Sequence, residues 1–287
     1  MAGDIRLSPP PLPSYHPRVA LDLFAAGTVL PAPTGARTIR DITYRADDRG
    51  PLLLDAYLPA DPAGPRPGVL LVNGDAPEAV IARAKDWGGF RSYGEHLAGR
   101  GIVGLPFNHH STEAGTHTGD VAREVAAAIA YVRAHAVELE VDADRIGVWA
   151  FSAAGPFGIA PLLGERPAYL RALAGFYAIW DLAPLRNTDA PPSEASIQQW
   201  SATSALGDSA AGLPAVFVAR AGRDGLRIKS GTDQFLARAL DLDLDVQLHN
   251  HPTGQHGFDI RDDDARSREI IRAALDFFTE RLSTPDR

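Results

Sequence analysis

Three side chains that could act together in acyl transfer occur along the chain in the order Ser152, Asp224, His256. A serine hydroxyl is a weak nucleophile at neutral pH and needs a neighbouring base to take its proton. Histidine suits that role because its usual pKa is about 6.5, and a carboxylate can hold the imidazole in one tautomer. Each of the three follows a predicted strand, in a loop that contains glycine. We therefore expect a nucleophile, an orienting acid and a base.

Small residues flank Ser152, with Ala150 and Ala154 two positions away on either side and Gly155 next. Only small side chains fit where a strand turns sharply into a helix and leaves the serine hydroxyl exposed. The usual form of this turn is Gly-x-Ser-x-Gly, and here alanine replaces both glycines. Alone, such a serine could be an ordinary helix N-cap. Asp224 could likewise be a turn residue and His256 a surface-loop residue, but the three in this order and context favour catalysis.

Composition narrows the class of protein. The chain has 287 residues, a formal net charge of −8 and no cysteine. Disulfides, thiolate nucleophiles and thiolate zinc sites are therefore excluded, and the acidic balance gives no support to a nucleic-acid partner. The N-terminal residues lack the basic start and apolar run of a signal peptide, and no apolar stretch is long enough to span a bilayer. We expect a cytoplasmic protein with no membrane partner and leave its oligomeric state open.

The rest of the chain predicts a single α/β domain over residues 37–287, preceded by an irregular proline-rich arm over 1–36. Two strand-like runs around a turn at 47–50 indicate an antiparallel hairpin. From residue 68 onward strands and helices alternate, which predicts a mostly parallel sheet with helices on both faces and no large cap domain. The predicted strands are Thr38–Tyr44, Leu52–Leu58, Val69–Val72, Ile102–Phe107, Ile146–Ala150, Leu173–Ile179, Ala215–Ala219 and Val246–His249.

Three stretches together resemble the α/β-hydrolase superfamily, most closely its dienelactone-hydrolase-like and carboxylesterase-like branches. The likeness covers about residues 38–282. It implies Ser152 as nucleophile, His256 as base, Asp224 as the third member and no cofactor. The stretches are Val148-Trp-Ala-Phe-Ser-Ala-Ala-Gly155, Ala219-Arg-Ala-Gly-Arg-Asp224 and Gly254-Gln-His-Gly-Phe258.

The resemblance also implies an oxyanion hole formed by the backbone N–H of Ala153 and by one from the loop after Val69–Val72. There the His-Gly-Gly-Gly sequence of many esterases is replaced by Asn-Gly-Asp, which puts Asp75 at the donor position. A carboxylate ~4 Å from the oxyanion would cost about 4 kcal/mol at an effective dielectric near 20. We therefore expect the Asp75 side chain to turn away, onto an arginine or loop amides. Dienelactone hydrolases proper use a cysteine nucleophile, which is a second departure.

Two further residues, His109 and Trp180, lie at strand ends where they could line a substrate pocket, although core packing is an equally good interpretation of the tryptophan. The histidines at 109, 110 and 117 lack the acidic partners and spacing of a zinc motif, so no metal site is expected. The acidic run at 262–264 is interpreted as a solvated cap of the last helix, with calcium binding as the alternative.

These observations predict a serine hydrolase that cleaves a small-molecule carboxylic ester through an acyl-enzyme on Ser152. Lactones, thioesters and amides are variants of the same chemistry. A peptidase of the prolyl-oligopeptidase type is an alternative, although such enzymes carry a large extra domain. A hydrolase-fold protein that binds a ligand without catalysis is another.

Overall fold

An eight-stranded sheet forms the centre of the computed structural model, which describes residues 25–62 and 64–283. The strands follow the apolar runs of the sequence, and every predicted run overlaps one of them. Their bounds are β1 (Arg37–Asp47), β2 (Gly50–Leu58), β3 (Arg66–Val72), β4 (Val103–Pro106), β5 (Val141–Phe151), β6 (Leu170–Phe176), β7 (Ala215–Ala221) and β8 (Val246–His251).

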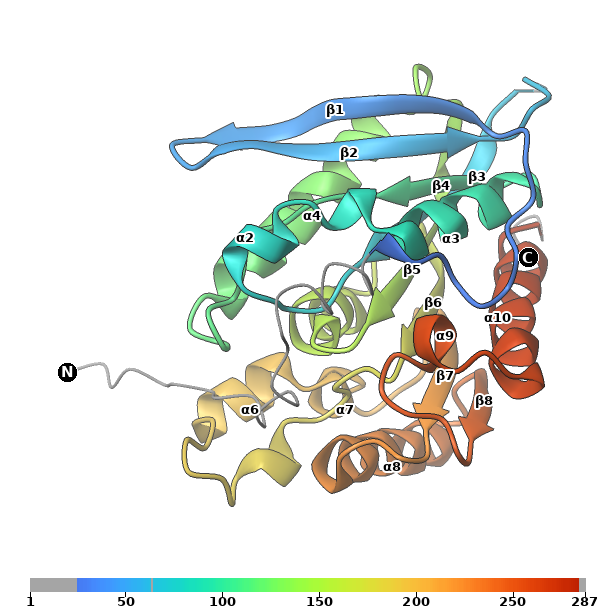
Figure 1. The fold of residues 1–287 in the computed structure, drawn as a ribbon. Coiled ribbons are helices and arrows are strands. Elements are labelled where there is room, and N and C mark those ends of the chain that lie inside the picture. The colour runs from blue at the N-terminus through green and yellow to red at the C-terminus, as the bar shows by residue number, and fades with distance from the viewer. Residues whose placement is uncertain (1–24, 63, 284–287) are drawn as a thin grey trace.

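The strand order across the sheet is β1-β2-β4-β3-β5-β6-β7-β8. β1 and β2 pair antiparallel, as does β2 with β4, and every later pair is parallel. The hairpin therefore precedes a parallel sheet (Figure 1), as predicted. The loops that follow β3, β5, β7 and β8 leave the same edge of the sheet, where parallel α/β folds bind their ligands.

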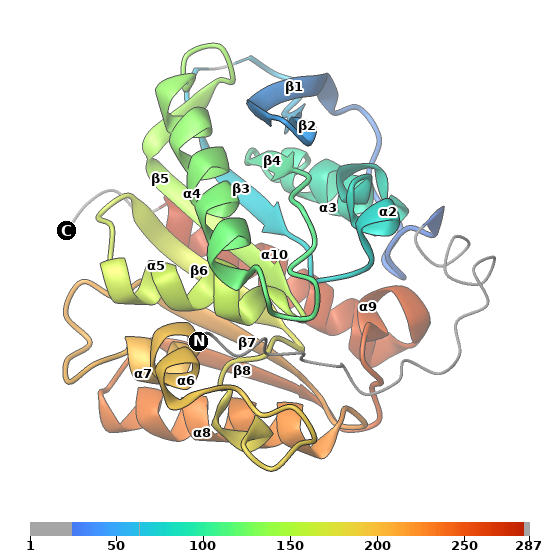
Figure 2. The same ribbon diagram turned by 90° about the vertical axis from the view of Figure 1, so that its left-hand side faces the viewer.

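Helices cover both faces of the sheet (Figures 1 and 2). Alternate strand residues enter two separate cores. Leu70 and Val148 pack with the helices at 118–134, 160–165 and 226–241, whereas Leu71 and Trp149 pack with the helices at 88–98 and 265–283. The longer helices are α3 (Gly88–Ala98), α4 (Thr118–Ala134), α6 (Glu194–Trp200), α8 (Leu226–Asp241) and α10 (Ala265–Ser283). The shorter ones are α2 (Glu78–Ile81), η1 (Ala84–Asp86), η2 (Gly155–Ile159), α5 (Ala160–Glu165), η3 (Ala183–Leu185), α7 (Ala202–Ala205) and α9 (Phe258–Arg261).

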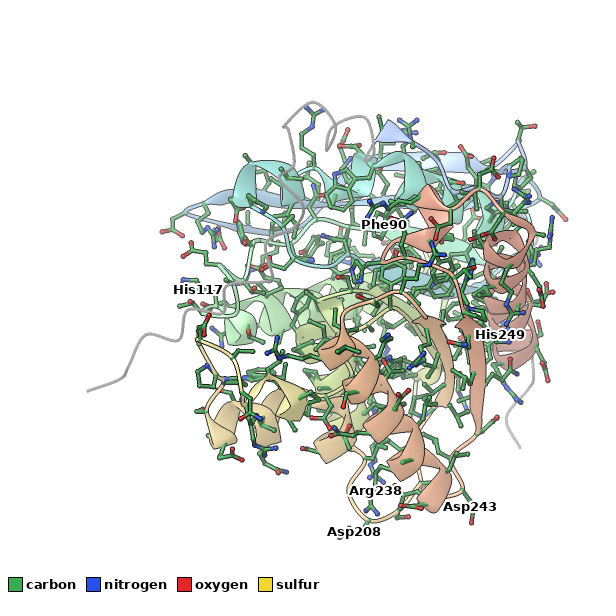
Figure 3. All side chains as sticks on the ribbon, turned by 60° about the horizontal axis from the view of Figure 1, so that its bottom comes forward. Phe90, His117, Asp208, Arg238, Asp243 and His249 are labelled. Atoms are coloured by element: carbon green, nitrogen blue, oxygen red, sulfur yellow. The ribbon has the colours of Figure 1, made fainter. Side chains whose placement is uncertain are left out.

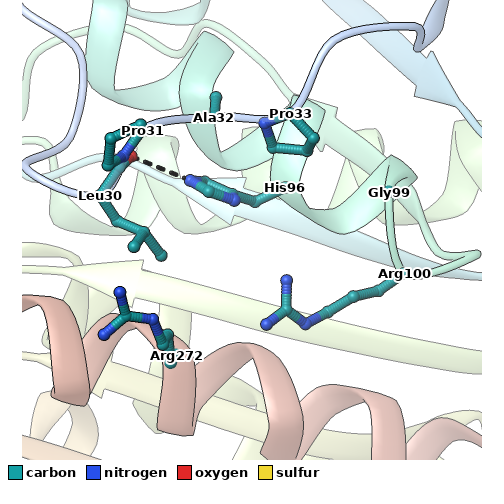
Figure 4. A pocket seen from close by; sticks show the side chains of 8 residues that line it. All are labelled: Leu30, Pro31, Ala32, Pro33, His96, Gly99, Arg100 and Arg272. Atoms are coloured by element: carbon teal, nitrogen blue, oxygen red, sulfur yellow. Dashed lines mark hydrogen bonds between the residues drawn. The ribbon is translucent and has the colours of Figure 1, made fainter.

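The described part of the predicted N-terminal arm, residues 25–36, packs along the domain without a long regular element. The backbone N–H of Val29 donates to the carbonyl of Asp259 at 2.8 Å, and the carbonyl of Leu30 lies 3.1 Å from Nε2 of His96. A surface pocket of about 380 Å³ lies between this segment, α3 and α10 (Figure 4). Residues 1–24 lie outside the described part, so the arm's boundary stays a prediction.

The connection between β6 and β7 holds only η3, α6 and α7, so it forms no large cap, as the sequence predicts. α7 packs against α5 and α8 at the side of the sheet. Among the described helices, none has the length and apolar character needed to cross a membrane.

Candidate active site

Ser152 lies at the turn between β5 and η2, in a backbone conformation that residues other than glycine rarely adopt. Its φ is +54°, which lies in the left-handed region and costs of the order of 1–2 kcal/mol for an L-residue. The surrounding backbone holds it there: its N–H donates to the carbonyl of Phe176 at 3.0 Å, and its carbonyl accepts the N–H of Ile179 at 2.9 Å. Strain maintained in this way is typical of functional positions.

The turn explains which positions near Ser152 require glycine. A Cβ on Gly155 would lie 1.8 Å from the carbonyl oxygen of Ile179, and one on Gly74 would lie 2.9 Å from Cβ of Ser152. Ala150 and Ala154 are both fully buried, so a methyl group is accommodated at the two positions where the usual motif has glycine. The closest backbone approach therefore falls three residues after the serine, not two.

The structure brings the three predicted catalytic residues into one hydrogen-bonded chain. Oγ of Ser152 lies 2.7 Å from Nε2 of His256, and Nδ1 of His256 lies 2.7 Å from Oδ2 of Asp224. The carboxylate can only accept, so Nδ1 carries the proton and Nε2 is left to accept the serine proton. The side chain of Asp224 is 5% exposed and that of His256 is 32% exposed, so the acid is sheltered while the base faces the site.

Two loops carry Asp224 and His256, and backbone contacts join these loops to each other. Gly222 donates its N–H to the carbonyl of His251 at 2.8 Å, and the N–H of Arg223 donates to the carbonyl of Gly254 at 2.9 Å. Oδ1 of Asp224 also accepts the N–H of the residue that follows it. A Cβ on Gly222 would lie 2.2 Å from the carbonyl oxygen of Pro252. The loops after β7 and β8 thus form one unit that fixes the distance between acid and base.

The loop after β3 lies against the Ser152 turn, where the oxyanion hole is predicted. The Cβ position of Gly74 is 3.3 Å from the backbone nitrogen of Ala153. Within the described residues, the backbone N–H groups of Asp75 and Ala153 donate to no protein acceptor. Two such donors beside a nucleophile suit the charge that develops on a substrate carbonyl oxygen.

The Asp75 side chain turns away from this position, as the sequence argument requires. Its carboxylate accepts hydrogen bonds from the Ser111 hydroxyl at 3.0 Å, from the Thr112 N–H at 3.0 Å and from the Thr112 hydroxyl. The partners are therefore a loop amide and two hydroxyls, and no arginine takes part among the described residues. The same loop is held by Glu124, which accepts the N–H of His110 at 2.9 Å.

The two residues expected to contact substrate, His109 and Trp180, are both completely buried, which corrects that expectation. His109 packs under the loop after β3, with Nε2 3.1 Å from the carbonyl oxygen of Asn73. Trp180 stacks on Phe235 with ring centroids 4.2 Å apart and belongs to the core between the sheet and α8. Both residues support the site from beneath instead of lining it.

The histidines of the 109–117 region do not converge. His117 lies on the outside of the molecule (Figure 3) near Glu113 and Asp120. A different group could ligate a cation: single ligand atoms of Asp47, His110 and Glu124 all lie within 4.8 Å of one another in the part of the chain described. Nδ1 of His110 is already 2.6 Å from Oε1 of Glu124, so the two buried members satisfy each other.

The acidic run at 262–264 caps the last helix, as predicted. Oδ1 of Asp264 accepts the N–H of Ser267 at 2.8 Å and lies 3.2 Å from Nε2 of His251. Asp262 accepts the N–H of Gln255 at 2.8 Å. These carboxylates therefore tie the loop that carries His256 to the start of α10.

Sequence reasoning missed a second buried carboxylate behind the site. Asp259 is 2% exposed and accepts hydrogen bonds from the hydroxyls of Tyr93 and Tyr177. The only signal in the sequence is an acid within the apolar stretch Gly-Phe-Asp-Ile after His256. Its tyrosine partners are 166 and 82 residues away, which no local pattern can indicate.

Several solved structures of similar fold are esterases. Esterase 2 of the planctomycete Thermogutta terrifontis is 21% identical, with alignment over 86% of this chain and 92% of that chain and a TM-score of 0.66. The same esterase phosphoramylated by tabun is 22% identical over 89% and 98% of the two chains, with a TM-score of 0.68. A truncated carbohydrate esterase from gut microbiota is 17% identical over 88% and 100%, with a TM-score of 0.69. The chain therefore has the α/β-hydrolase fold.

No curated protein matches the sequence. The sequence model of the BD-FAE family matches residues 54–216, which is more than half of the chain and runs from β2 into the start of β7. The matched stretch includes the loop after β3 and the turn at Ser152. With this match, the chain belongs to the BD-FAE family of the α/β-hydrolase fold.

Proposed function

We propose that this protein is a serine-dependent hydrolase of small-molecule carboxylic esters. The observation that carries the proposal is the unbroken chain from Oγ of Ser152 through His256 to Asp224, with 2.7 Å at each step. The backbone strain at Ser152 and the two free N–H donors beside it support the same conclusion. An accidental contact of three polar side chains would not account for all of these features together.

In the first half of the reaction, Oγ of Ser152 attacks the ester carbonyl carbon while Nε2 of His256 takes its proton. The carbonyl oxygen becomes an oxyanion, which accepts hydrogen bonds from the N–H groups of Asp75 and Ala153. Asp224 stabilises the imidazolium that has formed. The intermediate then collapses: the ester C–O bond breaks, the proton moves from His256 to the leaving alcohol, and the acyl group remains on Ser152.

In the second half, His256 takes a proton from water, whose oxygen attacks the acyl carbon. The second tetrahedral intermediate is held by the same two N–H donors. It collapses when the bond from the acyl carbon to Oγ breaks, and the proton on His256 returns to Ser152. The products are one carboxylic acid and one alcohol for each water consumed, and the protein's own residues supply every proton transfer in this sequence.

The substrate class rests on the structural neighbours and on the insertion after β6. Esterase 2 of Thermogutta terrifontis has been solved with butyrate and with propionate bound, and another neighbour is a carbohydrate esterase. These support an ester with a short acyl group. The solved structures of similar fold named above are esterases, and the short connection between β6 and β7 adds no large cap there, so we favour esters over peptides. Among α/β-hydrolase branches we propose a dienelactone-hydrolase-like one in which serine replaces cysteine.

Hydrolysis of p-nitrophenyl acetate, butyrate and octanoate tests the proposal. We expect turnover of the shorter esters, and Ser152→Ala should leave less than about a thousandth of the rate, as removal of a triad member does elsewhere. A matched anilide separates esterase from amidase chemistry, because its leaving amine must be protonated before it departs. The proposal fails if wild-type protein hydrolyses none of the esters, or if Ser152→Ala remains active.

A further inference from the structure

The buried carboxylate of Asp259 is not part of the Ser152–His256–Asp224 chain, although it lies only three residues after His256. Its Oδ1 accepts the Tyr177 hydroxyl at 2.7 Å and its Oδ2 accepts the Tyr93 hydroxyl at 2.6 Å. Hydroxyl–oxygen distances this short are typical of bonds to an ionised carboxylate. The three residues come from α9, from the position directly after β6 and from α3, so this arrangement is built from distant parts of the chain.

Tyr177 connects this carboxylate to the predicted base. Its ring centroid lies 4.6 Å from that of the His256 imidazole, at an interplanar angle of 57°. The residue is 7% exposed, and its φ of +39° is unusual for a side chain of this size. Its backbone N–H donates to the carbonyl of Ala219 at 2.8 Å. The phenol ring is thus fixed at both ends, by the backbone and by Asp259, and cannot swing away from the imidazole.

The charges around His256 also matter, because this ring becomes an imidazolium during acyl transfer. Asp224 contacts Nδ1, and Arg261 donates from Nη1 to the His256 carbonyl at 3.3 Å. Asp259 adds a second carboxylate behind the ring. Burial raises the pKa of Asp259 above its usual range, and the hydrogen bonds from the two tyrosines and the nearby His256 offset that rise only in part. An ionised Asp259 offsets the charge of Arg261 and favours the imidazolium.

We propose that Tyr177 and Asp259 are positioning residues that hold the His256 ring against Ser152 and stabilise its protonated form during acyl transfer. This inference rests on the proposed function. Tyr93 donates to the far oxygen of Asp259, and its ring packs against Trp149 and Phe151 on the side of the core. It therefore provides a matched control, because Tyr93→Phe and Tyr177→Phe each remove one hydroxyl bond to the same carboxylate.

The kinetic test compares Tyr177→Phe, Asp259→Asn and Tyr93→Phe with the wild type. We expect Tyr177→Phe to lower kcat about tenfold with little change in KM. A less well positioned His256 slows the proton transfer but does not change how the substrate binds. Tyr93→Phe should lower kcat less than about threefold, although its loss of stability in urea unfolding should be similar to that of Tyr177→Phe. Equal loss of kcat in the two tyrosine variants, or no loss in either, would overturn the proposal.

The second test does not depend on turnover. The titration of the His256 ring, followed by NMR, should move to lower pH in Asp259→Asn, because a neutral amide no longer favours the imidazolium. In an active enzyme the acid limb of kcat/KM should move the same way. An unchanged titration in folded Asp259→Asn would overturn the electrostatic part of the inference. Failure of the proposed function would give a different result. The wild-type protein would then hydrolyse no ester, although the His256 titration would still differ between the wild type and Asp259→Asn.

Discussion

The backbone N–H of Thr112 donates a hydrogen bond of 3.0 Å to Oδ1 of Asp75. Together with the bonds from the Ser111 and Thr112 hydroxyls, it fixes the Asp75 carboxylate on the loop after β4. Among the described residues, the backbone N–H of Asp75 is left without a protein acceptor. A carboxylate that would oppose an oxyanion thereby anchors the loop in which we propose one of the oxyanion donors.

Substitutions at Asp75 separate its carboxylate from its backbone donor. Asp75→Asn keeps the N–H and an acceptor for Thr112, so kcat/KM should fall less than tenfold. Asp75→Pro removes the donor and should cost about a hundredfold or more. Steady-state kinetics on a p-nitrophenyl ester measure both. An asparagine variant as inactive as the proline variant would mean that the carboxylate itself takes part in catalysis.

Gly74→Ala tests how closely the loop after β3 approaches the nucleophile. The added methyl group would meet Cβ of Ser152 at 2.9 Å and the backbone nitrogen of Ala153 at 3.3 Å. We expect kcat/KM to fall at least about tenfold because the loop must shift away from the oxyanion. Gly225→Ala is the control, since a Cβ there has no neighbour within 4 Å. Full activity of Gly74→Ala would place the oxyanion donors elsewhere.

An ion cluster beneath the hairpin, in which Lys85 and Asp55 are buried, Asp86 is partly buried and Asp41 is exposed, should dominate the stability of that region. The Lys85 ammonium lies 2.8 Å from Asp41, 3.1 Å from Asp55 and 2.9 Å from Asp86, and Asp55 is completely buried. Lys85→Met would leave the Asp55 carboxylate poorly compensated, so urea unfolding should show a loss of about 3–5 kcal/mol. The double variant Lys85→Met/Asp55→Asn should recover part of it. A loss below about 1 kcal/mol in Lys85→Met would show that the cluster contributes little.

The same cluster predicts part of the acid sensitivity. The hydrogen bond from Lys85 lowers the pKa of Asp41 below its usual 3.8. A carboxyl group with a lowered folded-state pKa stabilises the fold above its unfolded pKa, and that contribution is lost as the pH falls through the folded value. Lys85→Met should therefore lose stability less steeply than the wild type below pH ~4. Parallel curves for the two proteins would contradict this.

Chelation tests the expectation that no metal takes part. Activity should survive prolonged exposure to EDTA, because the proposed proton transfers use Ser152, His256 and Asp224 alone. If EDTA abolishes activity and zinc or calcium restores it, the group formed by Asp47, His110 and Glu124 is the place to examine. His110→Ala would then lose the restored activity.

The strands and the Ser152–Asp224–His256 constellation could be predicted because each depends on local sequence. A buried parallel strand is a run of apolar residues whatever its neighbours are, and the nucleophile, acid and base each follow such a run. Whether a side chain at a strand end faces the core or the cleft depends on distant packing. Trp180 is covered by Phe235 of α8, which no pattern around residue 180 indicates. The buried Asp259 was missed for the same reason.

Covalent labelling by a fluorophosphonate tests the central claim most directly. Organophosphorus agents, among them sarin and paraoxon, modify esterase 2 of Thermogutta terrifontis, and the probe belongs to the same chemical class. Mass spectrometry should find one adduct per chain, on the peptide that contains Ser152, with activity lost in proportion to labelling. Ser152→Ala should take up none, whereas Ser209→Ala, in an exposed loop, should label like the wild type. An adduct on another residue, or full activity after complete modification of Ser152, would contradict the account.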